Sequence, residues 1–84
     1  MMKFHVLVTK SFQKDFKKIR DLKFRGRIKI ELNKLSTNPY AGKKLKGTSV
    51  GQWRIRIGDY RIRYDIGGKE IILHRLRNRR EVYR

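Results

Sequence analysis

Apolar residues alternate with other residues at the start of the chain, where Phe4, Val6 and Val8 are separated by single positions. Such a period of two is typical of a strand, because successive side chains of a strand point to opposite faces of its sheet. We therefore predict a first strand at residues 2–8.

The spacing of apolar residues then changes to three and four, which indicates two helices that each bury one face. Their apolar stripes are Phe12, Phe16 and Ile19 in the first helix, and Phe24, Ile28, Leu32 and Leu35 in the second. Thr9 or Ser11 can cap the first helix, which is expected to end near Arg20, and Asp21 can cap the second. The Asn-Pro pair at 38–39 ends the second helix, because proline disfavours helical geometry at the preceding residue. Since almost no loop separates the two helices, we expect an antiparallel helical hairpin.

Beyond a connector at residues 40–51, the period returns to two in three segments. These predicted strands are residues 53–57, 60–66 and 70–77. Gly58-Asp59 and Gly67-Gly68 separate them, and glycine tolerates the positive φ that a tight hairpin turn requires. The last strand is apolar enough on both faces to be central. The predicted fold class is α+β: an antiparallel twisted sheet, made of the N-terminal strand and a three-stranded C-terminal meander, with the helical hairpin packed on one face.

Length and composition add further limits. The chain has 84 residues and no cysteine, so we expect a single domain covering residues 1–84, without disulfides or a cysteine-based metal site. The N-terminus lacks the features of a signal peptide, and no run of residues approaches the length of a membrane span. We therefore expect a cytoplasmic protein without a membrane partner.

Net charge points to an anionic partner. Lys and Arg number 24 against 7 Asp and Glu, which gives a formal net charge of +17. Self-repulsion of this size opposes compaction, and a nucleic acid, an anionic membrane or an acidic protein could each relieve it. Arginine dominates residues 53–84, and its planar guanidinium makes multi-donor phosphate contacts that lysine does not match. Nucleic acid is therefore the favoured partner class.

The first predicted hairpin gathers arginines on one face. A two-residue turn at 58–59 places Arg56 opposite Arg61 and Arg54 opposite Arg63, with the aromatic and aliphatic side chains on the other face. Like charges opposite each other in a sheet destabilise it by up to about 1 kcal/mol per pair. The arrangement therefore indicates a bound anion.

The length of the second turn decides which side chains of the last strand join this face. A three-residue loop at residues 67–69 places Ile72, His74 and Leu76 on the core face, and Arg75 and Arg77 with the other arginines. A two-residue loop reverses this parity. We expect the three-residue loop, because it keeps charge with charge, and we interpret His74 as a core histidine.

Several segments resemble the RelE/ParE superfamily of type II toxins. They are residues 38–39, 44–47, 53–64 and 79–83, in the order and spacing of that superfamily over nearly the whole chain. RelE-type members cut mRNA in the ribosomal decoding site, so the resemblance implies a ribosome-dependent endoribonuclease that uses no metal or cofactor. RNA can be cut in this way if its own 2′-hydroxyl attacks the adjacent phosphorus while the protein moves protons and stabilises charge.

The resemblance also implies the residues of the site. Arg61 matches the phosphate-binding arginine of the family, and Arg77 the arginine six residues before its terminal tyrosine. Tyr83 matches that tyrosine, which we expect to act as the base or to orient the nucleophile. These three residues are the expected catalytic set. The expected RNA-binding residues are Arg54, Arg56, Arg63, Arg75, Arg79, Lys44 and Lys46.

Two other functions remain open from the sequence. A ParE-like inhibitor of DNA gyrase shares the fold and acts by protein contact, and a non-enzymatic basic module could bind RNA or the ribosome. The resemblance also implies partners: the ribosome and mRNA, and an acidic RelB-like antitoxin that neutralises the basic face.

Overall fold

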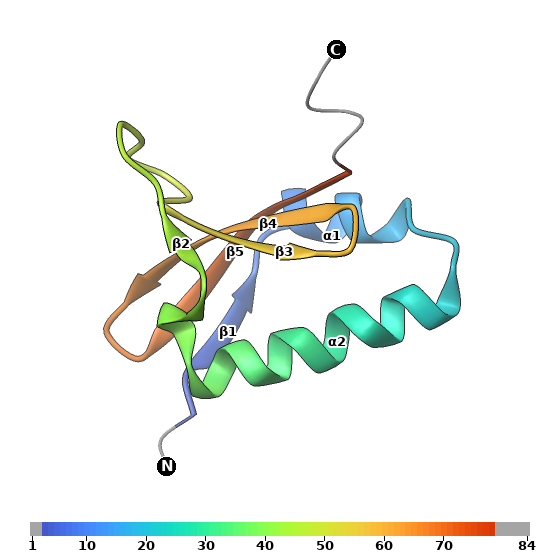
Figure 1. Ribbon diagram of the computed structural model, residues 1–84, viewed down its shortest axis with the longest axis horizontal. Coiled ribbons are helices and arrows are strands. Elements are labelled where there is room, and N and C mark those ends of the chain that lie inside the picture. Colours follow the sequence, from blue (N-terminus) through green and yellow to red (C-terminus); the bar gives the residue numbers. More distant parts are fainter. Residues whose placement is uncertain (1–2, 79–84) are drawn as a thin grey trace.

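The computed structural model describes residues 3–78, which form two helices, a short 3₁₀ turn and a five-stranded sheet (Figure 1). The helices are α1 (Lys10–Lys17) and α2 (Leu22–Thr37), and the 3₁₀ turn is η1 (Pro39–Ala41). The strands are β1 (His5–Val8), β2 (Lys43–Lys44), β3 (Trp53–Ile57), β4 (Tyr60–Gly67) and β5 (Glu70–Asn78). Among these residues, no helix is both long and apolar enough to span a membrane.

The strands follow the order β1-β5-β4-β3-β2, so β5 lies inside the sheet, as its apolar character predicts. The predicted α+β fold class is confirmed. Two details differ from the sequence prediction. β1 pairs with β5 in parallel, whereas the other pairs are antiparallel. The predicted connector also contains the two-residue strand β2, which pairs with the start of β3.

Both helices begin where the sequence predicts. The Thr9 hydroxyl accepts the backbone N–H of Phe12 at 3.2 Å, and Asp21 caps α2 through two backbone N–H groups. The first helix ends at Lys17 and not near Arg20. Arg25 on α2 donates to the carbonyls of Lys17 and Ile19, at 3.2 and 2.5 Å, and so binds the backbone on which a longer helix would continue.

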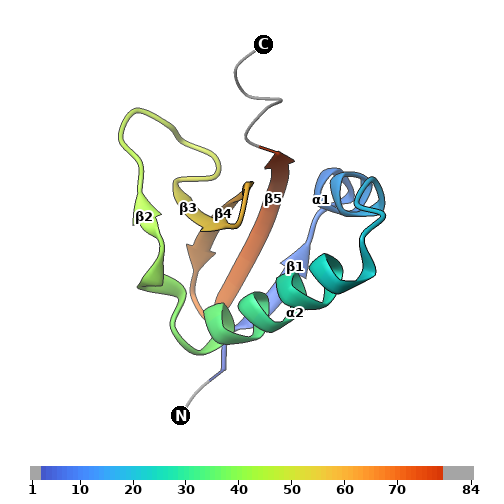
Figure 2. The ribbon, with the colours of Figure 1, turned by 45° about the vertical axis from the view of Figure 1, so that its right-hand side comes forward.

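The core lies between the helices and one face of the sheet (Figure 2). Its buried members are Phe12, Ile19, Ile28, Leu35, Ile57, Ile62, Tyr64, Ile71, Leu73 and Leu76. The fully buried Tyr64 donates its hydroxyl to the carbonyl of Pro39 at 2.8 Å. Burial raises the pKa of this phenol, although a hydrogen bond with the backbone of Gly42 opposes the shift. Tyr64 thus fixes η1 and the entry into β2.

The second hairpin corrects the prediction of a three-residue loop. Gly67 pairs with Glu70 across a two-residue turn, in which Gly68 has a φ of 59°. Ile72 then lies opposite Asp65, away from the core, while its neighbours Ile71 and Leu73 are buried. A β-bulge at residue 74 restores the predicted parity for the rest of the strand, because one unpaired residue reverses the alternation.

Candidate nucleic-acid interface

Basic side chains form two rows across the outer face of the sheet, which is the face away from the core. The first arginine row consists of Arg56, Arg61 and Arg77, and the second arginine row consists of Lys43, Arg54, Arg63 and Arg75. The predicted pairings of Arg56 with Arg61 and of Arg54 with Arg63 are confirmed. Since like charges on paired strands destabilise a sheet, these rows require either internal acceptors or a bound anion.

A small hollow lies between the two rows. Its volume is about 120 Å³, and it is lined by Leu45, Arg54, Arg61, Arg63 and Arg77. The hollow has the volume of about four water molecules, and the four arginines that line it suit a phosphate group. It unites Arg61 and Arg77, the two predicted catalytic arginines, with Arg54 and Arg63, two of the predicted RNA-binding residues.

Arg77, which lines this hollow, has an unpaired polar atom. Its Nε is buried and has no hydrogen-bond partner among residues 3–78. A buried donor without an acceptor costs about 1–3 kcal/mol, and few such groups persist in native proteins. An anion in the hollow would supply the acceptor.

Two other arginines of the outer face are already bound to protein groups. Arg63 donates from Nε to the carbonyl of Gly51 at 2.7 Å, and from Nη2 to the loop around Val50. Arg75 binds Asp15 with both Nε and Nη2, at 2.9 and 3.2 Å. The roles of Arg63 and Arg75 in RNA binding stay predictions, but both have a structural role as well.

Neither predicted lysine, Lys44 nor Lys46, belongs to the second arginine row, whereas Lys43 does. Lys44 lies opposite Trp53, which places its side chain on the other face from Arg54, and Lys46 is exposed in the following loop. Lys43 lies opposite Arg54 and extends the second arginine row to the edge of the sheet. The sequence did not single out Lys43, because its face depends on the unpredicted strand β2.

The remaining predicted residues, Arg79 and Tyr83, lie outside the described residues. The interpretation of His74 as a core histidine is wrong. Its Nε2 lies 2.9 Å from Oδ2 of Asp65, on the outer face. The two-residue turn reverses the predicted parity as far as the bulge, so His74 lies on the opposite face from the buried Leu73. One sequence signal pointed to an acceptor on the outer face: the alternation along β4 places Asp65 on the same face as Arg63.

Asp65 is surrounded by hydrogen-bond donors. Besides His74, it accepts the backbone N–H groups of Gly51 and Gln52, at 2.8 and 2.7 Å. Burial alone raises the pKa of this carboxyl, but the two backbone hydrogen bonds and the contact with His74 outweigh it and lower the pKa below its ordinary value. Asp65 is therefore held as a carboxylate.

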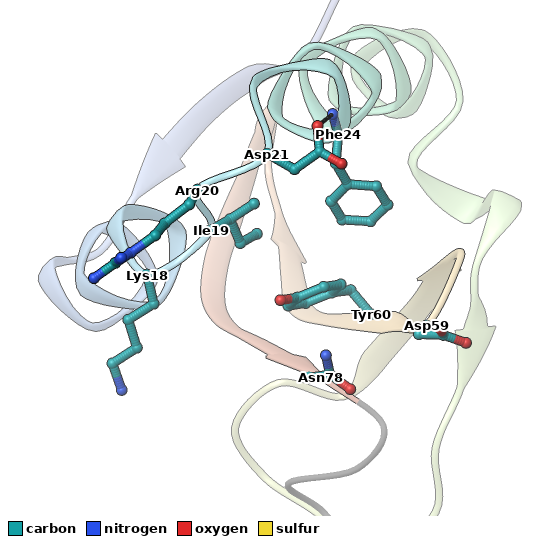
Figure 3. A pocket seen from close by; sticks show the side chains of 8 residues that line it. All are labelled: Lys18, Ile19, Arg20, Asp21, Phe24, Asp59, Tyr60 and Asn78. Atoms are coloured by element: carbon teal, nitrogen blue, oxygen red, sulfur yellow. Dashed lines mark hydrogen bonds between the residues drawn. The ribbon is translucent and has the colours of Figure 1, made fainter.

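A larger hollow, of about 480 Å³, lies at the end of the sheet beside the turn between the helices. Figure 3 shows the rings of Phe24 and Tyr60 facing each other there, with centroids 5.1 Å apart. Both signs of charge line it, since Lys18 and Arg20 are accompanied by Asp21 and Asp59. This hollow therefore lacks the charge selectivity of the smaller hollow between the two arginine rows, which we call the arginine hollow.

Metal-binding side chains do not gather in the described part of the chain. No group of three or more His, Asp or Glu residues that could hold a metal ion occurs there.

Comparisons with known proteins show the family and the fold of the chain. Residues 6–83 match the family model of the ParE toxin of the type II toxin-antitoxin system parDE. The chain is 36% identical to Toxin RelE3 of Methanocaldococcus jannaschii, over 93% of each protein. It is also similar to the structure of a RelB-RelE antitoxin-toxin complex from Methanococcus jannaschii, with a TM-score of 0.74, 33% identity, and coverage of 92% of this chain and 94% of the other.

A second structure supports the fold alone. The toxin-antitoxin complex RelBE2 from Mycobacterium tuberculosis is 23% identical, with a TM-score of 0.78 and coverage of 90% of this chain and 98% of the other.

Proposed function

Because the chain belongs to the RelE/ParE family of type II toxins, we propose that it is a ribosome-dependent endoribonuclease that cuts mRNA in the decoding site. The observation that carries the proposal is the arginine hollow. Guanidinium groups from three strands line it, and the buried Nε of Arg77 lacks an acceptor among residues 3–78. A phosphodiester of RNA supplies both the negative charge and the acceptor.

The proposed reaction needs no external nucleophile. The 2′-oxygen of the RNA attacks the adjacent phosphorus, its proton passes to a base, and the bond from phosphorus to the 5′-oxygen breaks. A proton then joins the departing 5′-oxygen, and a 2′,3′-cyclic phosphate remains. Arg61 and Arg77 stabilise the negative charge that grows on the phosphoryl oxygens, since preorganised donors act most strongly in a partly enclosed site. Tyr83, by its resemblance, is proposed as the base or as the group that orients the 2′-hydroxyl.

The proposal includes the partners. The net charge of +17 attracts ribosomal RNA and mRNA, with binding that weakens steeply as salt increases. The solved structures similar to this chain include complexes with RelB antitoxins. We propose that this toxin likewise binds an acidic antitoxin, which neutralises the basic outer face, and that it acts in the cytoplasm.

Primer extension on an actively translated message tests the reaction. We expect cuts within codons at the decoding site with the wild-type protein, and at least a hundredfold fewer with the Arg61→Ala variant. Uncut message with folded wild-type protein bound to translating ribosomes would falsify the nuclease proposal.

A second candidate function is inhibition of DNA gyrase. It is favoured by the family model, whose description names a ParE toxin. Such an inhibitor would leave the message intact and make DNA cleavage by gyrase persist in a supercoiling assay. The arginine hollow argues for the nuclease, because inhibition through protein contact does not need converging phosphate-binding groups.

A further inference from the structure

The loop between β2 and β3 is fixed to the outer face by side chains of β4 and β5. Asp65 accepts the N–H of Gly51 with Oδ2 and the N–H of Gln52 with Oδ1. Arg63 donates to the carbonyl of Gly51, so the same residue is held through both its N–H and its C=O. His74 contacts Oδ2 of Asp65 from the neighbouring strand. The loop is therefore bound to the sheet at its backbone.

We propose that Asp65, supported by His74, is a positioning residue for the arginine hollow, because it holds the β2–β3 loop as one wall of the phosphate site. The inference rests on the anion-binding part of the proposed function. Asp65 acts through the loop and through Arg63, and it does not itself contact the RNA.

Packing around Gly51 supports this role. The residue is buried, with a φ of 65°, and a Cβ added there would lie 3.2 Å from Cβ of Arg63. The loop thus approaches the second arginine row closely, and Leu45, at the start of the loop, lines the hollow itself. Arg63 is bound to loop carbonyls, and Arg54, Arg61 and Arg77 line the hollow beside it.

The β-bulge at His74 sets the position of the arginines of β5 relative to Asp65 and the loop. Without the unpaired residue, the alternation of β5 would place Arg75 and Arg77 on the core face. The bulge therefore brings Arg77 to the outer face, where it lines the hollow, while His74 contacts Asp65 on the same face. Bulges commonly re-aim side chains beside functional sites.

The two possible roles of Asp65, as a negative charge and as an anchor of the loop, predict opposite effects of its substitution on RNA binding. If the carboxylate acted only through its charge, its removal would strengthen anion binding, because a negative charge beside Arg63 would be lost. If the carboxylate positions the loop, an amide in its place keeps one oxygen as an acceptor but presents an NH2 group to the other backbone N–H, so one of the two anchors at Gly51 and Gln52 is lost. Whether the affinity for RNA increases or decreases therefore distinguishes the two roles.

The test measures binding of a short single-stranded RNA with 2′-O-methyl groups, which cannot be cut by its own hydroxyls. We expect Asp65→Asn to bind about tenfold more weakly than wild type, as the loss of one hydrogen-bonded anchor implies. Asp59→Asn is the matched control, because it removes the same charge at the exposed β3–β4 turn. It should bind equally or slightly more tightly. Amide NMR signals of Gly51 and Gln52 should move in Asp65→Asn and stay in place in Asp59→Asn.

The histidine is tested by two substitutions. His74→Gln retains a side-chain N–H for Asp65, so it should bind RNA and cut ribosome-bound message about as well as wild type. His74→Leu removes the contact and should weaken binding about threefold. It also provides the test if Asp65→Asn does not fold.

Three results would overturn the inference: tighter binding by Asp65→Asn, unchanged binding by His74→Leu, or lost cutting by His74→Gln at full affinity. The last would make His74 a proton-transfer group. Wild-type protein that binds the RNA but leaves ribosome-bound message uncut would refute the nuclease proposal and leave the positioning role intact.

Discussion

The two arginine rows use the same residue type on the same face of the same sheet, yet their guanidinium groups have different partners. In the second row, Arg63 is bound to loop carbonyls and Arg75 to Asp15. In the first row, Arg77 has a buried Nε without a partner among the described residues, and Arg56 is exposed with a hydrogen bond only to the nearby carbonyl of Gly58. The comparison teaches that neighbouring acceptors decide whether an arginine stabilises the fold or remains available to an anion.

The largest expected effect separates Arg77 from Arg75. Arg77→Met should lower cutting of ribosome-bound message about a hundredfold, because removing one preorganised donor from the charge that develops in a reaction typically has this size of effect. The variant should be at least as stable as wild type, since it removes a buried donor without an acceptor. Primer extension and thermal unfolding provide the two measurements.

Arg75→Met is the control for this comparison. It should unfold at a lower temperature and keep most of the cutting activity, because Arg75 is bound to Asp15 and does not line the hollow. If the two variants lost activity and stability to the same extent, the distinction between the rows would be wrong.

A smaller effect is expected at the structural partner of the second row. The Asp15 side chain is 5% exposed and also accepts the backbone N–H of Leu76 at 2.9 Å. Asp15→Asn should lower the free energy of unfolding by about 2 kcal/mol, less than for a fully buried ion pair because Arg75 is 41% exposed. Chemical denaturation measures this loss. RNA affinity of the folded variant should remain within about twofold of wild type, and a larger drop would connect Asp15 to the anion site.

Much of the fold could be predicted from the sequence. The caps at Thr9 and Asp21, the helix end before Pro39 and the Gly58-Asp59 hairpin all depend on local chemistry, and all are confirmed. The parallel pairing of β1 with β5 depends on contacts between distant parts of the chain, for which a local period carries no information.

The candidate site shows the same division. The pairing of Arg54 and Arg56 with Arg63 and Arg61 follows from a two-residue turn and could be predicted. The environment of His74 could not, since it depends on whether the second turn has two or three residues, and the glycines there allow both. The ion pair between Asp15 and Arg75 joins a helix to a strand 60 positions away, which charge patterning along one element does not reveal.

Acid unfolding tests whether the Asp65 carboxylate stabilises the folded protein. Its pKa is lowered in the folded protein, so the carboxylate contributes stability above its ordinary pKa of 3.8. That contribution is lost as the pH falls through the folded value, because the unfolded chain takes up the proton first. Denaturation between pH 6 and pH 2 should show a steeper loss of stability in wild type than in Asp65→Asn. Parallel curves would mean that the carboxylate is not specifically stabilised.

The smallest effect is expected at the exposed member of the first row. Arg56 donates from Nε to the carbonyl of Gly58 at 3.0 Å and does not line the arginine hollow. Arg56→Met should therefore weaken RNA binding only about twofold to threefold at moderate salt, and it should lower the slope of log affinity against log salt by at most about one, the share of a single phosphate contact. Titrations at several salt concentrations measure both quantities. A loss as large as that of Arg77→Met would extend the phosphate site along the whole first row. Membership of the row that contains Arg61 would then decide which arginines bind RNA, and contact with the hollow would not.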